Sequence, residues 1–227
     1  MSNNKHTDIL VIGSGPGGYA AAFRAADLGR EVTLVDKDPT LGGVCLNRGC
    51  IPSKTLLHIA KVLEEAESLK KMGVTFTKPT IDIDLVRDWK NKVVSQLSGG
   101  IGQMAKARKV NTVQAEATFL SDNEVQLKSE SSTEIITFDH CVVASGSSSS
   151  IIPGIPFDNE NVLTSKTALD LKKIPESLLV IGGGYIGLEM GTVFSALGSS
   201  VSLAEFLPNH EIIKESGPKN GMGAVSA

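Results

Sequence analysis

The chain has 227 residues, enough for one large hydrophobic core or two smaller ones. Its 22 Lys and Arg nearly balance its 25 Asp and Glu, so the net charge is only -3, without a basic stripe or a polybasic tail. This balance argues against nucleic acid or an anionic membrane surface as a partner, and small molecules are the expected ligands. The N-terminus lacks a secretory or transit pattern, so we expect a cytoplasmic protein with no membrane segment.

The first predicted unit is a strand, a glycine-rich turn, a helix and a second strand. The pattern is an apolar run, a glycine cluster, an alanine-rich segment and an alternating segment, at residues 8–12, 13–18, 17–28 and 31–36. Gly29 stands where the end of a helix commonly takes glycine. The order predicts a β-α-β unit whose second strand ends in Asp36.

Two helices and a group of antiparallel strands are predicted next. The helices carry Glu and Lys at helical spacing and span residues 55–72 and 85–109. Residues 110–138 alternate between apolar and polar and are broken by turn residues, which predicts an antiparallel meander. Residues 140–146 read as one further, buried strand.

A serine run at residues 147–150, with two prolines close behind it, predicts a domain boundary. After this boundary the order of the first unit returns. A strand, a glycine-rich turn, a small-residue helix and a second strand are predicted at residues 177–181, 182–187, 187–197 and 200–205. Counted from Gly13 to Gly182, the second copy is offset by 169 residues.

Each copy contains the spacing GxGxxG, at Gly13, Gly15 and Gly18 and again at Gly182, Gly184 and Gly187. Such glycines allow a tight turn from strand to helix and let backbone N–H groups approach a pyrophosphate. In both copies an acidic residue, Asp36 or Glu205, follows 23 positions after the first glycine, where it can accept a ribose hydroxyl. Two complete copies predict two dinucleotide sites, rather than two ordinary glycine-rich turns. A carboxylate in place of Arg favours NAD over NADP at the second.

Cys45 and Cys50 lie in the segment GGVCLNRGCIPSK, in a chain with three cysteines. A close pair of this kind is more often redox-active or metal-binding than structural. Pro52 lies near the first turn of the next helix, so the helix N-terminus can stabilise a Cys50 thiolate, and Lys54 adds a positive charge. The pair lacks further ligands at a metal-binding spacing, so no metal site is predicted. Inert structural thiols remain the alternative.

This cysteine segment, the first glycine motif with Asp36, the segment VVASG and the segment GGGYIGLEMG together resemble the flavin-dependent disulfide oxidoreductases. Within that family the resemblance is closest to the dihydrolipoamide dehydrogenases, and it runs from about Asp8 to Leu207. We therefore expect an α/β protein with a three-layer, Rossmann-like FAD-binding domain that includes an antiparallel meander. The domains expected are this FAD-binding domain with its redox-active disulfide, a partial Rossmann-like NAD-binding domain and an irregular tail, at residues 1–150, 151–207 and 208–227.

The resemblance implies FAD and NAD as cofactors. The residues implied for FAD are Gly13, Gly15, Gly18, Asp36, Lys37, Gly42, Gly43, Lys54, Ala117, Ser145, Gly146 and Ser147. Those implied for NAD are Gly182, Gly183, Gly184, Tyr185, Ile186, Gly187, Glu189 and Glu205.

The resemblance also implies a relay in which dihydrolipoamide reduces a Cys45–Cys50 disulfide and NAD finally receives the electrons. Cys50 would face the flavin, Cys45 would be the more exposed thiol that exchanges with the substrate, and Lys54 would pair with Glu189. The implied partner is dihydrolipoamide itself or the lipoyl domain of a 2-oxo acid dehydrogenase complex or of the glycine cleavage system.

Family members are longer than this chain and homodimeric, and their interface domain supplies a catalytic His–Glu pair. We therefore expect a truncated chain that lacks the interface domain. Its four histidines, His6, His58, His140 and His210, are expected to be solvated or packed. Two alternatives to the dehydrogenase remain: an inactive FAD-binding fragment, and a related reductase of the glutathione or mercuric type.

Overall fold

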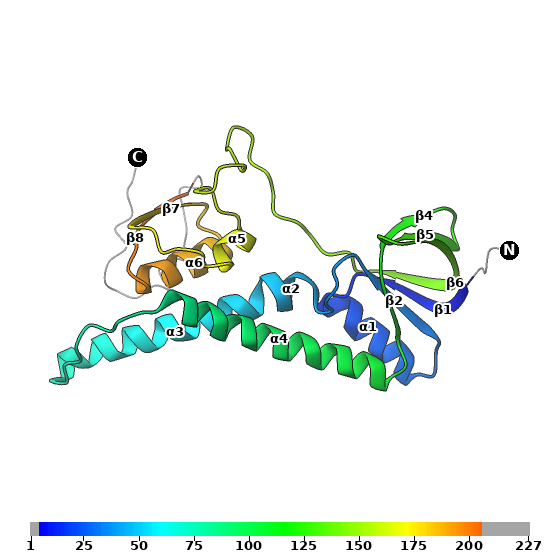
Figure 1. The fold of residues 1–227 in the computed structure, drawn as a ribbon, viewed down its shortest axis with the longest axis horizontal. Coiled ribbons are helices and arrows are strands. Elements are labelled where there is room, and N and C mark those ends of the chain that lie inside the picture. The colour runs from blue at the N-terminus through cyan, green and yellow to red at the C-terminus, as the bar shows by residue number, and fades with distance from the viewer. Residues whose placement is uncertain (1–4, 206–227) are drawn as a thin grey trace. The chain divides into compact units, whose positions relative to one another are not determined.

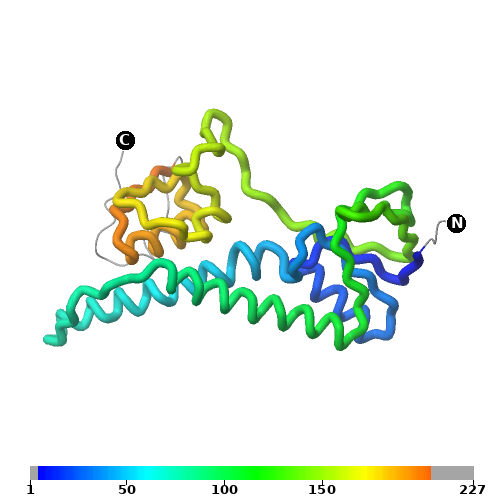
Figure 2. The backbone as a smooth tube through the Cα atoms, in the orientation of Figure 1, coloured from blue at the N-terminus to red at the C-terminus, as the bar shows by residue number. Residues whose placement is uncertain are grey.

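The computed structural model describes residues 5–205, and the expected irregular tail at residues 208–227, with His210, lies outside them. The described residues form two compact units. The first contains residues up to 52 and residues 91–150, and the second contains residues 53–90 and those from 151 onward. Figure 1 labels the helices and strands, and Figure 2 follows the same chain as a tube.

A six-stranded mixed sheet forms the centre of the first unit. The strands are β1 (Lys5–Ile12), β2 (Val32–Asp36), β3 (Asn111–Gln114), β4 (Glu116–Phe119), β5 (Glu124–Lys128) and β6 (Thr133–Val143). Their order is β3-β2-β1-β6-β5-β4. Strands β3, β2, β1 and β6 are parallel, and β5 and β4 extend the sheet in antiparallel fashion. This arrangement confirms the predicted α/β class.

Helix α1 (Pro16–Asp27) carries the chain from β1 to β2. Its Ala22 and Phe23 pack against Val11 and Leu34 of those strands, and both strand residues are fully buried. Gly29, at φ +81°, follows the helix end in the left-handed conformation that glycine adopts without strain. The predicted β-α-β unit is therefore confirmed, with boundaries within a few residues of those expected.

The prediction for the remaining strands of this sheet was partly wrong. Strand β3, expected to belong to the meander, instead pairs with β2 in parallel. Of the expected separate strand at residues 140–146, residues 140–143 are the end of β6 and residues 144–146 lie outside any strand, and most of these residues are exposed instead of buried. Asp139 and His140 do not break β6 because both side chains are exposed. The antiparallel pairs β4–β5 and β5–β6 confirm the meander itself.

Helices α2 (Gly43–Arg48), α3 (Cys50–Ser68) and α4 (Ile83–Ala107), with the short 3-10 helix η1 (Leu69–Met72), separate β2 from β3. Helix α3 starts five residues earlier than predicted, so that Cys50 is its first residue. Helix α2 was not predicted, because six residues are too few to show a helical period.

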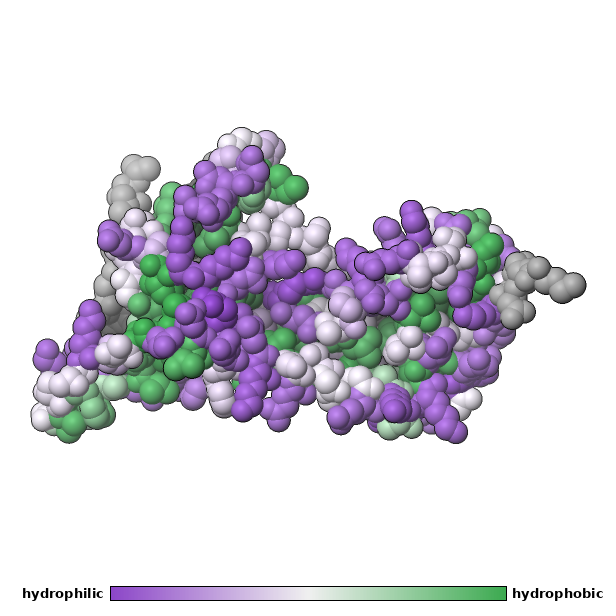
Figure 3. Space-filling view, viewed as in Figure 1, coloured by the Kyte–Doolittle hydropathy of each residue, from purple (hydrophilic) through white to green (hydrophobic). Residues whose placement is uncertain are grey.

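The second unit contains a parallel pair of strands, β7 (Ser177–Ile181) and β8 (Ser200–Ala204), joined by α6 (Tyr185–Ala196). This is the second predicted β-α-β unit. Phe194 of α6 is only 1% exposed and packs with Leu56, Leu169 and Leu171. By contrast, Leu179 and Ile181 of β7 are largely exposed. Figure 3 shows hydrophobic side chains on the surface of the part that holds α6, β7 and β8.

Two basic side chains of α4 bind the end of the short helix α5 (Ser165–Leu169) in the second unit. The buried Lys90 ammonium donates to the Leu169 carbonyl at 2.6 Å, and Arg87 donates to the Leu171 carbonyl at 2.8 Å. These bonds satisfy carbonyl groups that the end of a helix leaves unpaired. Burial, with a smaller contribution from the Arg87 charge, lowers the pKa of Lys90 in spite of nearby Asp170.

Within residues 5–205 the structure contains no helix that is both long enough and apolar enough to cross a membrane.

We expect Phe194→Ala to lower the free energy of unfolding of the second unit by about 3–5 kcal/mol, because it opens a cavity in that unit's core. Phe76→Ala is the matched control, since the Phe76 side chain is 58% exposed in the same unit and its loss should cost less than about 0.5 kcal/mol. Urea unfolding of both variants measures the difference. Equal losses would contradict the assignment of Phe194 to the core.

Candidate functional site

The first glycine-rich loop joins β1 to α1 through close backbone contacts. A Cβ atom on Gly18 would lie 1.7 Å from the Gly13 carbonyl oxygen, and a Cβ on Gly13 would lie 2.2 Å from the Ala144 oxygen. Neither distance is compatible with a side chain, and Gly13 also has φ +101°. The turn therefore forms only with glycine at both positions.

Asp36, the last residue of β2, is hydrogen-bonded to this loop. Its carboxylate accepts the backbone N–H and the hydroxyl of Ser14, each at 2.6 Å, and the N–H of Asp38 at 2.9 Å. Burial by itself would raise the pKa of Asp36. The bonds from Ser14 and Asp38, with a smaller effect of the Arg48 charge, hold it below its ordinary value. An ionised carboxylate offers about four acceptor positions, so Asp36 can also accept a ribose hydroxyl.

The N-terminus of α1 is suited to an anion. In the described part of the chain no side chain caps this helix, and its first turn contains no acidic residue. The first N–H groups of a helix have no partner inside the helix and carry partial positive charge. The loop and the helix start thus fit the pyrophosphate of a dinucleotide.

The second glycine-rich loop repeats this geometry within the second unit. A Cβ on Gly187 would lie 2.3 Å from the Gly182 oxygen, and the Glu205 carboxylate accepts the N–H of Gly183, just as Asp36 accepts that of Ser14. Among the described residues, α6 also lacks a side-chain cap and has no acid in its first turn. Tyr185 and Ile186 at its start are exposed. The residues predicted for a second dinucleotide therefore form a matching cradle.

The glycine pair at the start of the cysteine segment lies against the first loop. The N–H of Gly42 donates to the Ser14 carbonyl at 2.9 Å. A Cβ on Gly43 would lie only 2.6 Å from the Gly15 Cα. Because Gly43 begins α2, this contact fixes the start of the helix that carries Cys45 against the first glycine-rich loop.

The structure gives Cys45 and Cys50 as thiols, on two consecutive helices. Cys45 lies inside α2 and is half-buried, whereas Cys50 is the first residue of α3 and is exposed. The expectation that Cys45 is the more exposed thiol is therefore wrong. The difference goes with their positions, because Cys45 lies within α2 whereas Cys50 occupies a helix end.

Lys54 and Glu189 form the predicted ion pair, in the second unit. The Lys54 ammonium donates to Glu189 at 2.5 Å and to the Tyr185 hydroxyl at 3.0 Å. Burial by itself would raise the pKa of Glu189, but hydrogen bonds from Lys54, Ser53 and Tyr185 lower it. The bond to Glu189 is also the main cause of the raised pKa of Lys54. The charge of Glu189 in an otherwise apolar helix is thus compensated.

The other predicted FAD residues lie at two places in the first unit. Ser145, Gly146 and Ser147 follow β6 and are exposed. Since β1, β2 and β6 are parallel, these residues lie at the same sheet edge as the first glycine loop and Asp36. Ala117 lies on β4 instead, where it packs against the core of the first unit.

Two features around the first loop were not predicted. Ser14 is fully buried and supplies two of the hydrogen bonds to Asp36. Arg48, at the end of α2, forms a two-pronged ion pair with Asp38, just after β2. Ser14 offers no recognisable signal in a single sequence. The Arg48–Asp38 pair joins residues ten positions apart, a spacing that no regular element specifies.

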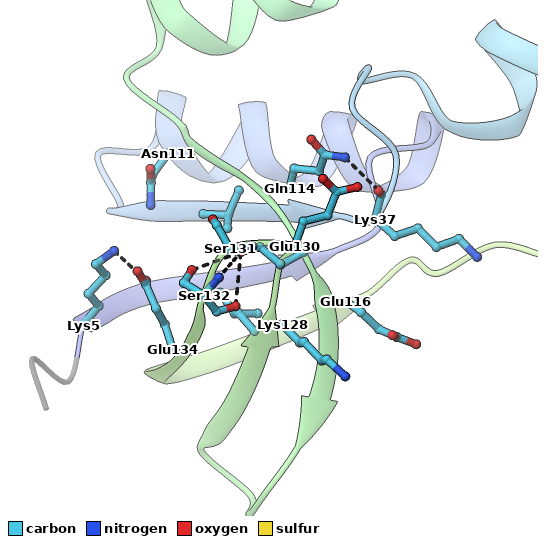
Figure 4. Close-up of a pocket in the computed structure, with 14 residues that line it drawn as sticks. Lys5, Lys37, Asn111, Gln114, Glu116, Lys128, Glu130, Ser131, Ser132 and Glu134 are labelled. Carbon is cyan, nitrogen blue, oxygen red and sulfur yellow. Dashed lines mark hydrogen bonds and ion pairs between the residues drawn. The ribbon is translucent and has the colours of Figure 1, made fainter.

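A separate open cavity of about 640 Å³ lies between the parallel part of the sheet and the meander (Figure 4). Its lining is strongly polar, with charged side chains of both signs, including Lys5, Lys37, Lys128, Glu116, Glu130 and Glu134. Lys5 and Glu134 neutralise each other at 2.6 Å. Small-molecule sites are mostly apolar, so this cavity does not resemble one. Lys37 is its only lining residue from the predicted FAD set.

Known proteins match nearly all of the chain. Residues 7–216 match the family described as pyridine nucleotide-disulphide oxidoreductase. A dihydrolipoyl dehydrogenase of Vibrio cholerae is 48% identical over 90% of this chain and 43% of the relative, and one of Buchnera aphidicola subsp. Acyrthosiphon pisum is 49% identical over 92% and 45%. The chain therefore spans less than half the length of these relatives.

A solved structure gives the same result for the fold. It is the Cu(II) complex of the HOCl-induced flavoprotein disulfide reductase RclA from Escherichia coli, with a TM-score of 0.75 and 28% identity over 89% of this chain and 42% of that one. The likeness confirms the predicted Rossmann-like architecture. With its two glycine loops and the cysteine segment that lies on the first of them, the chain belongs to the pyridine nucleotide-disulphide oxidoreductase family.

Proposed function

We propose that this chain carries the FAD-binding and disulfide-bearing part of a dihydrolipoyl dehydrogenase, which oxidises dihydrolipoamide to lipoamide with NAD as the acceptor. The observation that supports it most directly is the contact of Gly42 and Gly43 with the first glycine loop, because the start of the Cys45 helix then lies against the turn to which this proposal assigns FAD. Membership of the family implies FAD and NAD(H) as cofactors.

The chain offers a distinct set of residues for each cofactor. The start of α1, the first glycine loop and Asp36 would hold the FAD pyrophosphate and ribose, and Ser145 to Ser147 border the same sheet edge. The start of α6 and Glu205 would hold NAD in the equivalent way. Lys37, Lys54 and Ala117 complete the proposed FAD set, and Glu189 orients Lys54. When bound, the flavin accepts two electrons from a dithiol and delivers them to NAD as a hydride.

The protein's own chemistry is thiol–disulfide exchange. In the oxidised form a disulfide joins Cys45 and Cys50, and a substrate thiolate attacks the Cys45 sulfur, so that Cys50 leaves as a thiolate. The second substrate thiolate then attacks the sulfur joined to Cys45 and releases the cyclic disulfide product. Two electrons thus remain on the two protein sulfurs, and the two substrate protons pass to a base or to water. Cys50 suits the leaving role because the N-terminus of α3 stabilises a thiolate.

The proposed substrate is the dithiol of dihydrolipoamide, free or on the lipoyl domain of a 2-oxo acid dehydrogenase complex or of the glycine cleavage system. The proposed assembly of the full-length relatives is a homodimer. A second candidate function is an FAD-binding fragment that exchanges no electrons. Flavin content and anaerobic reduction by dihydrolipoamide, followed by NAD turnover, distinguish the two candidates.

We expect Gly18→Ala to weaken FAD binding at least about tenfold, which is about 1.4 kcal/mol, because the new Cβ must displace the Gly13 carbonyl. Gly17→Ala is the control, since its Cβ would find its nearest neighbour at 4.0 Å. The flavin-to-protein ratio after gel filtration measures both variants. Equal flavin contents would contradict the assignment of this loop to FAD.

Cys50→Ser should abolish the gain of thiols that dihydrolipoamide produces in the oxidised protein, because no disulfide can form with Cys45. Cys141→Ser should leave that gain unchanged, since Cys141 lies on β6 and burial raises the pKa of its thiol. Thiol titration of the denatured protein, after substrate removal, measures the gain. A normal gain in Cys50→Ser would exclude the proposed disulfide.

Glu205→Arg should shift the ratio of NADH to NADPH affinity toward NADPH by about tenfold or more, because it exchanges an acceptor of the ribose hydroxyl for a partner of a 2′-phosphate. Glu176→Arg makes the same charge change on an exposed residue just before β7, at the other end of the strand pair, and should leave the ratio unchanged. Titration calorimetry gives both affinities. An unchanged ratio in Glu205→Arg would mean that NAD does not bind this loop.

A further inference from the structure

Three side chains with metal-ligating atoms meet on the sheet of the first unit: His6, Asp8 and Asp139. His6 and Asp8 are two residues apart on β1, so they project from the same face of the strand. The neighbouring β6 is parallel to β1 and pairs Thr137 with His6, which puts Asp139, two residues further on, beside Asp8. The cluster thus depends on the register of two strands.

The donor atoms of this cluster are close enough for one cation. One imidazole nitrogen and two carboxylate oxygens all lie within 4.8 Å of one another. Ligands about 2.0–2.2 Å from a tetrahedral Zn²⁺ lie about 3.3–3.6 Å apart, so a movement of about 1 Å or less by each side chain closes the site. His6 and Asp139 are exposed and can make such movements by side-chain rotation.

The hydrogen bonds of His6 direct one ring nitrogen toward the carboxylates. Its Nδ1 lies 3.0 Å from the Thr137 hydroxyl oxygen, and that hydroxyl donates to the Lys5 carbonyl at 3.4 Å. The hydroxyl oxygen must then accept from Nδ1–H, which assigns the lone pair of a neutral ring to Nε2. Nε2 lies 3.5 Å from the Asp139 carboxylate. The Nε2 lone pair and the carboxylate are both electron donors, so one metal cation can bind to both of them.

The Asp8 carboxylate is also held in a fixed position by a hydrogen bond. Its Oδ2 accepts the backbone N–H of Glu31 at 3.0 Å, which fixes the side chain at the entrance to β2. This bond is the outer-sphere support that orients a ligating carboxylate.

We propose that His6 Nε2, Asp8 and Asp139 bind a first-row divalent transition-metal cation such as Zn²⁺, with water in the remaining coordination positions. Mixed imidazole and carboxylate ligands suit these metals, whereas an all-oxygen set suits Mg²⁺ or Ca²⁺. The site is separate from both nucleotide loops: His6 lies at the start of β1 and Gly13 just after its end, about 20 Å away along the strand. It needs no ligand from the cysteine pair. Its cation would join β1 to β6 across the centre of the sheet.

The test measures Zn²⁺ binding to the full chain by equilibrium dialysis and atomic absorption. Cys45 and Cys50 are replaced by serine in every sample, because two neighbouring thiols would themselves bind Zn²⁺. We expect one Zn²⁺ per chain in this background. His6→Ala and Asp139→Asn should each lower the affinity about tenfold or more, because even the loss of a residue that only orients a metal ligand costs about 10–100-fold.

His140→Ala is the matched control. His140 is also exposed on β6 but, being next to Asp139, projects from the opposite face of the strand, so its loss should leave the affinity unchanged. Circular dichroism shows whether His6→Ala folds. If it does not, Asp139→Asn still tests the site, because it keeps the shape of an exposed side chain. Three outcomes would overturn the proposal: no stoichiometric binding in the parent, unchanged affinity in both ligand variants, or an equal loss in His140→Ala.

Discussion

The close backbone contact between Gly18 and Gly13 in the first glycine loop is the constraint on which the remainder of the first unit depends. Because Gly18 packs against the Gly13 carbonyl, α1 can start directly after β1, and its N-terminus faces the loop. The Ser14 amide and hydroxyl are then positioned to bind Asp36, which fixes the end of β2. Gly43 adds the cysteine helix to the same turn. A bulkier residue at any of these glycines would therefore disturb several elements together.

The same close glycine contact occurs in both glycine-rich loops, but different side chains lie around each loop. In the second loop Gly187 and Glu205 reproduce the contacts of Gly18 and Asp36. The helix that follows this second loop carries Glu189, which forms an ion pair with Lys54. The cysteine segment, by contrast, contacts the first loop through Gly42 and Gly43. The duplication thus gives two similar cradles, and the side chains added to each one determine the chemistry it supports.

The repeated β-α-β units were predictable because glycine spacing, helices rich in small residues and terminal acids are local patterns. The short helices α2 and α5 were not, since five or six residues carry no period. The continuity of β6 through Asp139 and His140 was missed because two adjacent polar residues usually mark the end of a buried strand. In β6 both side chains are exposed, so the strand continues through them. The relative exposure of Cys45 and Cys50 depends on where helices begin, which composition does not specify. Ser14 and the His6 cluster depend on strand register, which a single sequence shows only indirectly.

The core of the second unit is assembled from segments that are far apart in the chain, and this has a consequence for folding. Leu56 packs with Phe194, and Arg87 and Lys90 bind the end of α5, across intervals that contain most of the first unit. Contacts of such high sequence separation form slowly, because a long loop must close before they are gained. During synthesis, the apolar side chains around Leu56 therefore stay uncovered until α6 has left the ribosome. Strands β1 to β6 can pair before that point. The two units are thus expected to mature in sequence, and the interval between them is when the chain is most exposed to aggregation.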